Sequence, residues 1–356
     1  MPGDLTFVIS ADYARATGGW IYDERLLAGL TGVGWRIERL TLPGGFPEPS
    51  AAARAQAAAS LRAVADDSLV LADQLCLGVL PEVARAEARR LRLAMIVHHP
   101  LALEGANRAH RAHDRDRLAR SEADALSHVR AVIATSPSTA RLLTTDYAVP
   151  SEKIIVAVPG VDRRPLARGS GARVQLVCVG AVVPRKDHIL LIRALADLER
   201  LPWRLTIVGN LTRAAAHAGR VRGMIRARGL APRIKLLGEV SDEELARLWS
   251  GADLYVAASR HEGYGMAIAE ALAHGLPVVS TYAGAAGAWI GRRGARIVPG
   301  ARVVPLRAAL RQVIANRTLY ASLRREAVAR RRTLPSWEAT AAVVDRGLQQ
   351  LVENRT

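Results

Sequence analysis

The sequence predicts two successive open α/β domains, each a parallel β-sheet covered by helices. Three observations predict this fold: a length of 356 residues, short apolar runs that alternate with Ala- and Leu-rich helical stretches, and a single break in that alternation. Domains usually hold about 100–200 residues, so the length suits two of them. Alternating strands and helices are typical of parallel sheets with helices on their faces.

The first half of the chain supplies the first set of elements, because β-branched and Leu-rich runs mark strands there. Strands are expected at Leu5–Ser10, Trp35–Leu40, Leu69–Leu71, Arg92–His98, Ala131–Thr135 and Lys153–Val156. Helices are expected at Trp20–Gly29, Ala51–Ala65, Pro81–Arg90, Arg108–Arg130 and Ser136–Asp146. Ser136 suits the N-cap of the last of these, and Pro137 suits its first position.

A turn-rich segment, Pro159–Gly171, interrupts the alternation, as interdomain linkers do. We therefore expect a first domain over residues 1–162, a linker over 163–172, a second domain over 173–335, and a helix over 336–356 that returns toward the first domain. In the second half, strands are expected at Gln175–Val179, Leu205–Val208, Ile234–Leu237, Leu254–Ala257 and Val278–Ser280. The helices expected after them are Arg307–Ala315, Leu319–Arg330 and Ser336–Val352.

Composition excludes several classes of protein. Two cysteines cannot build a disulfide framework, and no apolar run approaches the roughly 18–20 residues of a membrane span, so a cytoplasmic protein is expected. The net charge of +17 is uneven: residues 1–165 carry 20 basic and 19 acidic side chains, and the remainder carry 30 and 14. A basic half attracts phosphates. Aromatic residues make up only 4%, which argues against a nucleic-acid partner.

The most informative segment is His261–Val279, which follows the strand Leu254–Ala257. Its first residues form a loop at the carboxyl end of that strand, where ligands bind in open α/β sheets. Gly263 and Gly265 allow a close approach of backbone to ligand, and the first helical amides suit an anion such as a diphosphate. Glu262 and Glu270 suit hydroxyl groups on either side of it. A sugar nucleotide supplies both.

A basic pair, Arg185 and Lys186, follows the first strand of the second domain. Two cations at a strand end suit a nucleotide diphosphate and the charge that builds on a leaving phosphate.

The Glu262–Val279 run resembles the signature of retaining glycosyltransferases of the GT-B fold, family 4. The segments Val179–Asp187, Leu205–Gly209, Gly238–Val240, Ala252–Leu254 and Pro159–Asp162 resemble that family as well. The resemblance implies two Rossmann-like domains with an interdomain cleft, the first binding the acceptor and the second the nucleotide-sugar donor. It also implies that Arg185 and Lys186 bind the donor diphosphate, Glu262 the sugar hydroxyls and Glu270 the ribose.

The same resemblance assigns the remaining donor-binding residues. They are Gly18, Gly19, Gly209, Val240, Gly263, Tyr264, Gly265, Met266 and Ala267. Gly18 and Gly19 match the family's first-domain glycine loop, and His98 matches a position that often contacts the transferred sugar or the reacting centre. The implied reaction is transfer of a hexose from a nucleoside-diphosphate sugar, UDP before GDP, to an acceptor hydroxyl with retention of configuration.

No metal is expected, because His98 lacks a third ligand at suitable spacing and the pair Asp114 and Asp116 lies in a basic helical run. The basic residues of that run suit a solvated face, acceptor guidance or contact with an anionic membrane. They are Arg108, Arg111, Arg115, Arg117 and Arg120, with His110 and His113. The acceptor stays open between a lipid, a small metabolite and a saccharide. A noncatalytic nucleotide-sugar-binding protein and a GT-B sugar-nucleotide epimerase are the alternative functions.

Overall fold

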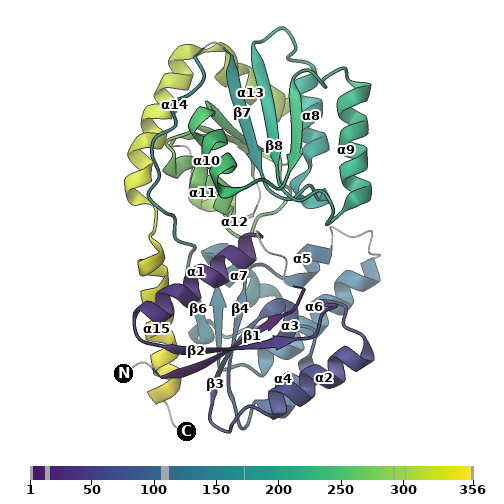
Figure 1. Cartoon of the computed structure of the whole chain (residues 1–356), viewed down its shortest axis with the longest axis vertical. Helices are drawn as coiled ribbons and strands as arrows, with labels where there is room; N and C mark the ends of the chain where they lie inside the picture. Colours follow the sequence, from purple (N-terminus) through teal and green to yellow (C-terminus); the bar gives the residue numbers. More distant parts are fainter. Residues whose placement is uncertain are drawn as a thin grey trace. The chain divides into compact units, whose positions relative to one another are not determined.

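A computed structural model describes residues 3–12, 17–105, 112–171, 173–282, 284–291, 293–300 and 302–353. The chain divides into two compact units. Unit 1 combines the residues up to Gly160 with those from Pro335 onward, and unit 2 is Val161–Leu334. The described part of each unit contains one six-stranded parallel sheet with helices packed on it (Figure 1).

The sheet of unit 1 has the strand order β2-β1-β3-β4-β5-β6. Its strands are β1 (Asp4–Ser10), β2 (Arg36–Leu42), β3 (Leu69–Asp73), β4 (Arg92–Val97), β5 (Ala131–Ala134) and β6 (Ile154–Val156). Its helices are α1 (Gly18–Gly32), α2 (Ala51–Arg62), α3 (Gln74–Leu77), α4 (Pro81–Glu87), α5 (Leu101–Gly105), α6 (Ala112–Ser127), α7 (Pro137–Asp146) and α15 (Trp337–Glu353). The chain moves outward from β1 to β2 and then returns to the other side of β1 with β3, so the strand order reverses between β1 and β3.

The sheet of unit 2 has the order β12-β11-β10-β7-β8-β9. Its strands are β7 (Val174–Val179), β8 (Trp203–Val208), β9 (Ile234–Gly238), β10 (Leu254–Ala257), β11 (Val278–Thr281) and β12 (Ala295–Val298). Its helices are α8 (His188–Ala196), α9 (Ala215–Ala227), α10 (Asp242–Gly251), α11 (Met266–Ala273), α12 (Ala285–Ile290), α13 (Val303–Ala315) and α14 (Arg317–Arg330). Here the order reverses between β7 and β10, which are paired neighbours.

Several expected elements differ from the structure. The helix expected over Arg108–Arg130 is α6, which ends at Ser127, and residues 106–111 lie outside the described residues. Strand β12 and helices α3, α5 and α12 were not expected, because each is too short to show a period. The helix expected over Pro81–Arg90 ends at Glu87.

Buried aliphatic side chains fill both units on either side of the sheets. Cys76 and Cys178 are buried thiols. Within the described ranges, no helix has the length and apolar content to cross a membrane.

Candidate functional site: a charged cluster at the carboxyl edge of unit 2

The charged residues predicted from the sequence meet where the strand order of unit 2 reverses. Arg185 and Lys186 lie in a short 3-10 turn, Pro184–Lys186, that follows β7. Glu262 lies in the loop that follows β10. Since β7 and β10 are parallel neighbours, their carboxyl ends bring these loops together at the position where open α/β sheets bind ligands.

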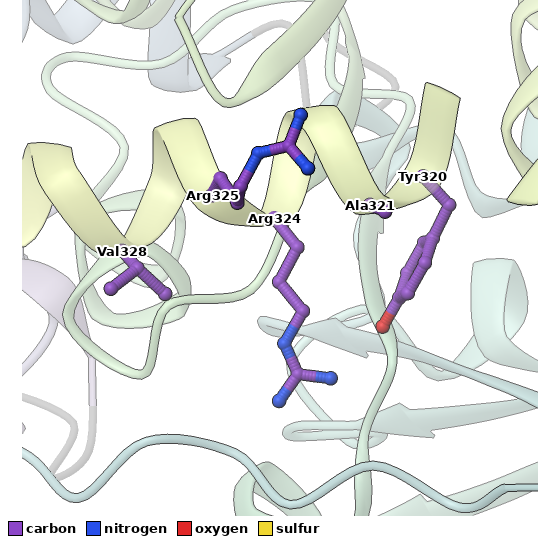
Figure 2. A pocket seen from close by; sticks show the side chains of 5 residues that line it. All are labelled: Tyr320, Ala321, Arg324, Arg325 and Val328. Carbon is purple, nitrogen blue, oxygen red and sulfur yellow. The ribbon is translucent and has the colours of Figure 1, made fainter. Parts of the chain in front are cut away.

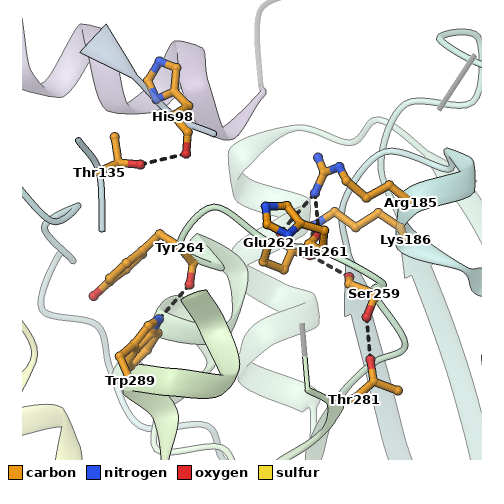
Figure 3. Close-up of polar contacts among 10 residues, drawn as sticks. All are labelled: His98, Thr135, Arg185, Lys186, Ser259, His261, Glu262, Tyr264, Thr281 and Trp289. Atoms are coloured by element: carbon orange, nitrogen blue, oxygen red, sulfur yellow. Dashed lines mark hydrogen bonds and ion pairs between the residues drawn. The ribbon is translucent and has the colours of Figure 1, made fainter. Parts of the chain in front are cut away.

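Glu262 is the centre of this cluster (Figure 3). Lys186 Nζ lies 2.6 Å from Glu262 Oε1, and Arg185 Nη1 lies 3.3 Å from Oε2. Ser259 Oγ donates a 2.6 Å hydrogen bond to Glu262 Oε1, and Thr281 Oγ1 donates one of the same length to the Ser259 carbonyl. Glu262 is only 8% exposed, so its charge depends on these partners.

The charges of the cluster favour a bound anion. Burial alone would raise the pKa of the Glu262 carboxyl, but Lys186 and Arg185, together with hydrogen bonds from Lys186 and Ser259, lower that pKa to about 2. One carboxylate is therefore surrounded by two cations. The cluster keeps one excess positive charge at a site with little access to water, where an anion gains most from it.

Backbone and side-chain contacts tie the two loops together. The Arg260 amide donates to the Arg185 carbonyl at 2.8 Å, and Arg260 Nε lies 2.7 Å from Asp187 Oδ2. Asp187 has a left-handed backbone with φ of 42°, and its other carboxylate oxygen accepts a hydrogen bond from the Leu190 amide at the start of α8. Asp187 thus caps α8 and connects it to the loop of Glu262.

Gly209 lies beside the same turn because its backbone runs against that of Gly180. A Cβ at Gly209 would lie 2.2 Å from the Gly180 carbonyl oxygen, and a Cβ at Gly180 would lie 3.1 Å from Lys186 Cε. Only glycine at position 209 permits this approach. Val240 lies farther along, in the loop between β9 and α10.

An aromatic stack holds the Gly263–Gly265 loop. The Tyr264 ring is stacked on Trp289 of α12, with centroids 4.9 Å apart and planes inclined by 10°. Trp289 Nε1 donates to the Tyr264 carbonyl at 2.7 Å, and the Arg330 guanidinium of α14 lies 5.4 Å from the centroid of Trp289 (Figure 3 shows the first two residues). Gly265, with φ of 92°, caps α11.

Helix α11 carries the other residues predicted for this side of the site. Met266 and Ala267 are half-buried in its first turn, and Glu270 is half-buried one turn further on. The two glutamates are thus presented by a loop and by the helix that directly follows it, as the sequence predicts.

In unit 1 the structure surrounds His98 with two carboxylates that sequence reasoning missed. His98 follows β4, and its Nε2 lies 3.3 Å from both Asp23 Oδ1 and Asp73 Oδ2. Burial alone would lower the pKa of this imidazole, but Asp23 and Asp73 outweigh it and raise the pKa to about 10. Asp73 ends a strand, a signal that could have been used. Asp23 lies inside a helix and gives no such signal.

Gly18 and Gly19 form the first turn of α1, whose N-cap is Thr17. The Thr17 hydroxyl accepts a hydrogen bond from the Trp20 amide at 3.2 Å. Gly18 is exposed and Gly19 half-buried, at the edge of unit 1 that also carries His98.

The expectation that His98 has no further candidate metal ligands near it is wrong. Within the described ranges, Asp23, Asp73 and His98 place their ligand atoms within 4.8 Å of one another, a spacing that also admits a metal ion. The distances from His98 Nε2 to the two carboxylate oxygens are those of an ion pair. An ion pair therefore explains why the three side chains lie together, and no metal ion is needed for it. Asp114 and Asp116 stand two residues apart on α6, so their side chains leave the helix in different directions.

A hollow on the surface of unit 2 lies elsewhere. It holds about 510 Å³ along α14 and is lined by Tyr320, Ala321, Arg324, Arg325 and Val328 (Figure 2). These residues come from a single helix, and Arg324 Nη2 donates to the Ala167 carbonyl. None of the predicted site residues lies there, so we place no substrate in it.

Two family models match the chain, one on each half. Residues 173–316 match the model described as "Glycosyl transferases group 1", and residues 31–164 match that described as "Glycosyltransferase Family 4". Between them they match most of the chain.

Three curated relatives are mannosyl- or glycosyltransferases by name. The chain is 28% identical over 319 residues to an MMP alpha-(1->4)-mannosyltransferase of Mycolicibacterium hassiacum, covering 85% of this chain and 75% of the relative. It is 32% identical over 163 residues to the lipopolysaccharide core biosynthesis mannosyltransferase LpcC of Rhizobium leguminosarum, covering 44% and 46%. With a D-inositol 3-phosphate glycosyltransferase of Geodermatophilus obscurus, identity is 32% over 231 residues, covering 59% and 50%.

Solved structures share the fold at low sequence identity. Sucrose-phosphate synthase from Thermosynechococcus elongatus superposes with a TM-score of 0.82 at 19% identity, covering 99% of this chain and 100% of that one. Anabaena Alr3699/HepE in complex with UDP-glucose superposes with a TM-score of 0.77 at 19% identity, covering 98% and 99%. The two-sheet GT-B architecture expected from the sequence is confirmed.

Proposed function

Because this chain belongs to the family 4, group 1 glycosyltransferases, we propose that it transfers a hexose from a nucleoside-diphosphate sugar to an acceptor hydroxyl, with retention and without a metal. The observation that carries the proposal is the Glu262 carboxylate between Lys186 and Arg185 at the reversal point of the unit 2 sheet. A net positive cluster beside a double-glycine loop suits a diphosphate joined to a sugar.

Binding of the donor exchanges the partners within this cluster. The diphosphate takes hydrogen bonds from Lys186 and Arg185, which now go to Glu262. The oxygens of Glu262 are then left to accept hydrogen bonds from sugar hydroxyls, which are neutral donors. Glu270, one turn into α11, accepts hydrogen bonds from the ribose hydroxyls. The backbone amides of Gly263–Ala267 face the phosphate or the sugar.

The cations also act on the chemical step. As the glycosidic bond breaks, negative charge builds on the leaving phosphate, and Lys186 and Arg185 stabilise it. Departure of the diphosphate and attack of the acceptor on the same face of the sugar let that phosphate take the acceptor's proton. Retention then needs no nucleophile from the protein. His98, at the carboxyl edge of the unit 1 sheet, contacts the transferred sugar.

The identity of the donor draws support from two sources. One structural neighbour holds UDP-glucose by its title, and two relatives are mannosyltransferases by name. We therefore favour UDP-hexoses, with GDP-hexoses next. The acceptor is a hydroxyl of a small metabolite, saccharide or lipid, since relatives' names include both an inositol phosphate and lipopolysaccharide core.

The direct test is turnover of UDP- and GDP-hexoses by the wild type and by Glu262→Gln, Glu270→Gln and Lys186→Ala. We expect slow donor hydrolysis without acceptor in the wild type. We expect a loss of about 100-fold in Lys186→Ala, because the charge-assisted contact with the diphosphate disappears together with its stabilisation of the leaving phosphate. Glu243→Gln and Lys235→Ala are matched controls, since both side chains are exposed in unit 2. Full activity in all three site variants contradicts the assignment, and binding without turnover supports a noncatalytic protein.

Metal and membrane dependence have separate tests. Activity is expected to survive dialysis against EDTA, and a loss restored by a divalent ion contradicts metal independence. We propose a cytoplasmic location. Contact with an anionic membrane is one of the three roles open to the basic run that contains Arg115, Arg117 and Arg120, and flotation with anionic liposomes at low salt tests it. A chain that floats supports this contact, and a chain that never floats contradicts it.

A further inference from the structure

Three polar residues meet at the carboxyl edge of the unit 1 sheet, and none of them belongs to the donor cluster of unit 2. Asp23 lies in the second turn of α1, Asp73 is the last residue of β3, and His98 directly follows β4. Asp23 is 0% exposed and Asp73 1%, while the His98 side chain is 13% exposed. Two fully buried carboxylates therefore stand behind one imidazole that still reaches the surface.

The ring of His98 is held from several sides. Its Nε2 is 3.3 Å from an oxygen of each carboxylate. The other oxygen of Asp73 accepts a 2.7 Å hydrogen bond from the Leu75 amide, which fixes that carboxylate as the cap of α3. The edge of Tyr22 packs against the imidazole at 5.4 Å between centroids, and the Tyr22 hydroxyl donates to the Ala157 carbonyl. Thr135 Oγ1 donates to the His98 carbonyl at 3.0 Å (Figure 3).

The net charge of this cluster is opposite in sign to that of the donor cluster. Two carboxylates out of water require a cation between them, and a protonated His98 supplies it. The three groups together then carry one excess negative charge, which repels a diphosphate. A protonated ring in this setting is suited to donate a hydrogen bond to a neutral oxygen, such as a sugar hydroxyl.

We propose that Asp23 and Asp73 are positioning residues, which act through His98 by holding its ring in one orientation and in its protonated form for a sugar hydroxyl. This inference rests on the proposed glycosyl transfer. It assigns no contact with substrate to either aspartate. Their effect on turnover must therefore disappear when His98 itself is replaced.

A double-mutant cycle tests this dependence. Asp23→Asn and Asp73→Asn, each made in the wild type and in His98→Gln, are assayed for turnover of UDP- and GDP-hexoses and for affinity toward free UDP and GDP. We expect each asparagine substitution to lower turnover about tenfold in the wild type and less than about twofold in His98→Gln. The larger loss in the wild type corresponds to one hydrogen-bonded ion pair with His98, which the His98→Gln background has already lost. Affinity for the free nucleotides stays unchanged, because the diphosphate site lies in unit 2.

The controls separate this role from a structural one. Glu87→Gln removes another buried carboxylate of unit 1, paired with Arg90, and is expected to lower stability with no loss in turnover per folded molecule. Wild-type turnover in either asparagine variant, equal losses with and without His98, or activity that needs an added divalent ion would each overturn the proposal.

A second readout does not depend on glycosyl transfer. The ring nitrogens of His98, assigned by their absence in His98→Gln, are expected to give NMR shifts of a doubly protonated imidazole near neutral pH. Asp23→Asn and Asp73→Asn are expected to change those shifts. A singly protonated ring in the wild type refutes the inference about the aspartates. A wild type that neither binds nor consumes any sugar nucleotide, with the ring protonated, refutes the proposed function instead.

Discussion

Glu262 is the residue on whose partners the donor site depends. Sequence reasoning identified Glu262, Arg185 and Lys186 separately, each from its place after a strand. It did not predict that they touch, because the contact joins positions 76 and 77 residues apart. Such a contact follows from the pairing of β7 with β10, which a single sequence does not specify.

The first prediction concerns the acid stability conferred by Glu262. Its pKa is about 2 in the folded chain and returns to its ordinary 4.5 on unfolding. The unfolded state therefore takes up the proton first as the pH falls, so the stabilisation is complete above about 4.5 and is lost toward about 2. Glu262→Gln should be less stable than the wild type by up to about 3 kcal/mol at neutral pH.

Urea unfolding across this pH range measures that difference. It should shrink as the pH is lowered from above 4.5 toward 2, whereas Glu243→Gln, which removes an exposed carboxylate, should show little difference at any pH. A gap between Glu262→Gln and wild type that stays constant with pH contradicts the ion-pair account.

At the scale of elements, the donor loop owes its shape to helices that lie later in the chain. The Gly263–Gly265 turn was predictable from its glycines and from the helix that follows. The stack of Tyr264 on Trp289 was not, because α12 has only six residues and no readable period. Arg330, 41 residues beyond Trp289, completes the support by donating to its carbonyl.

The second prediction separates the two contributions of Trp289. Trp289→Phe keeps an aromatic face but loses the Nε1 hydrogen bond, and should lower the free energy of unfolding by about 1 kcal/mol. Trp289→Leu loses the stack as well and should lower it by about 2 kcal/mol. Calorimetric titration with UDP and GDP should show affinity falling in the same order. Unchanged affinity in Trp289→Leu would show that the stack does not shape the nucleotide site.

At the scale of the whole molecule, the chain leaves unit 1, builds unit 2 and returns with α15. This helix packs on α1, and Trp35 Nε1 donates to Asp345 Oδ1 at 2.8 Å. The sequence predicts a linker over residues 163–172 and a terminal helix over 336–356 that returns to the first domain. The structure divides the chain slightly earlier, after Gly160, and assigns the residues from Pro335 onward to unit 1. The close contact of α15 with α1 requires small residues, because Gly29 faces Ala341. A single sequence does not show that these two positions meet, so this contact could not be predicted.

The third prediction uses two glycines of α1 as a matched pair. A Cβ at Gly29 would lie 2.6 Å from the Ala341 Cβ, whereas one at Gly32 meets nothing within 4 Å. Gly29→Ala should therefore destabilise the protein by about 1–3 kcal/mol through overpacking. Gly32→Ala should leave stability unchanged or raise it by up to about 1 kcal/mol. Equal thermal unfolding of the two variants would contradict the packing of α15 on α1.

The central claim is that Lys186, Arg185 and Glu262, with the loop beside them, hold the diphosphate of a sugar nucleotide. Calorimetric titration of UDP and GDP into the wild type, Lys186→Met and Lys235→Met tests it most directly. The account predicts that at least one nucleotide binds the wild type and Lys235→Met alike, and binds Lys186→Met about 10- to 100-fold more weakly. Equal binding by all three proteins, or no binding of either nucleotide to the wild type, would contradict it.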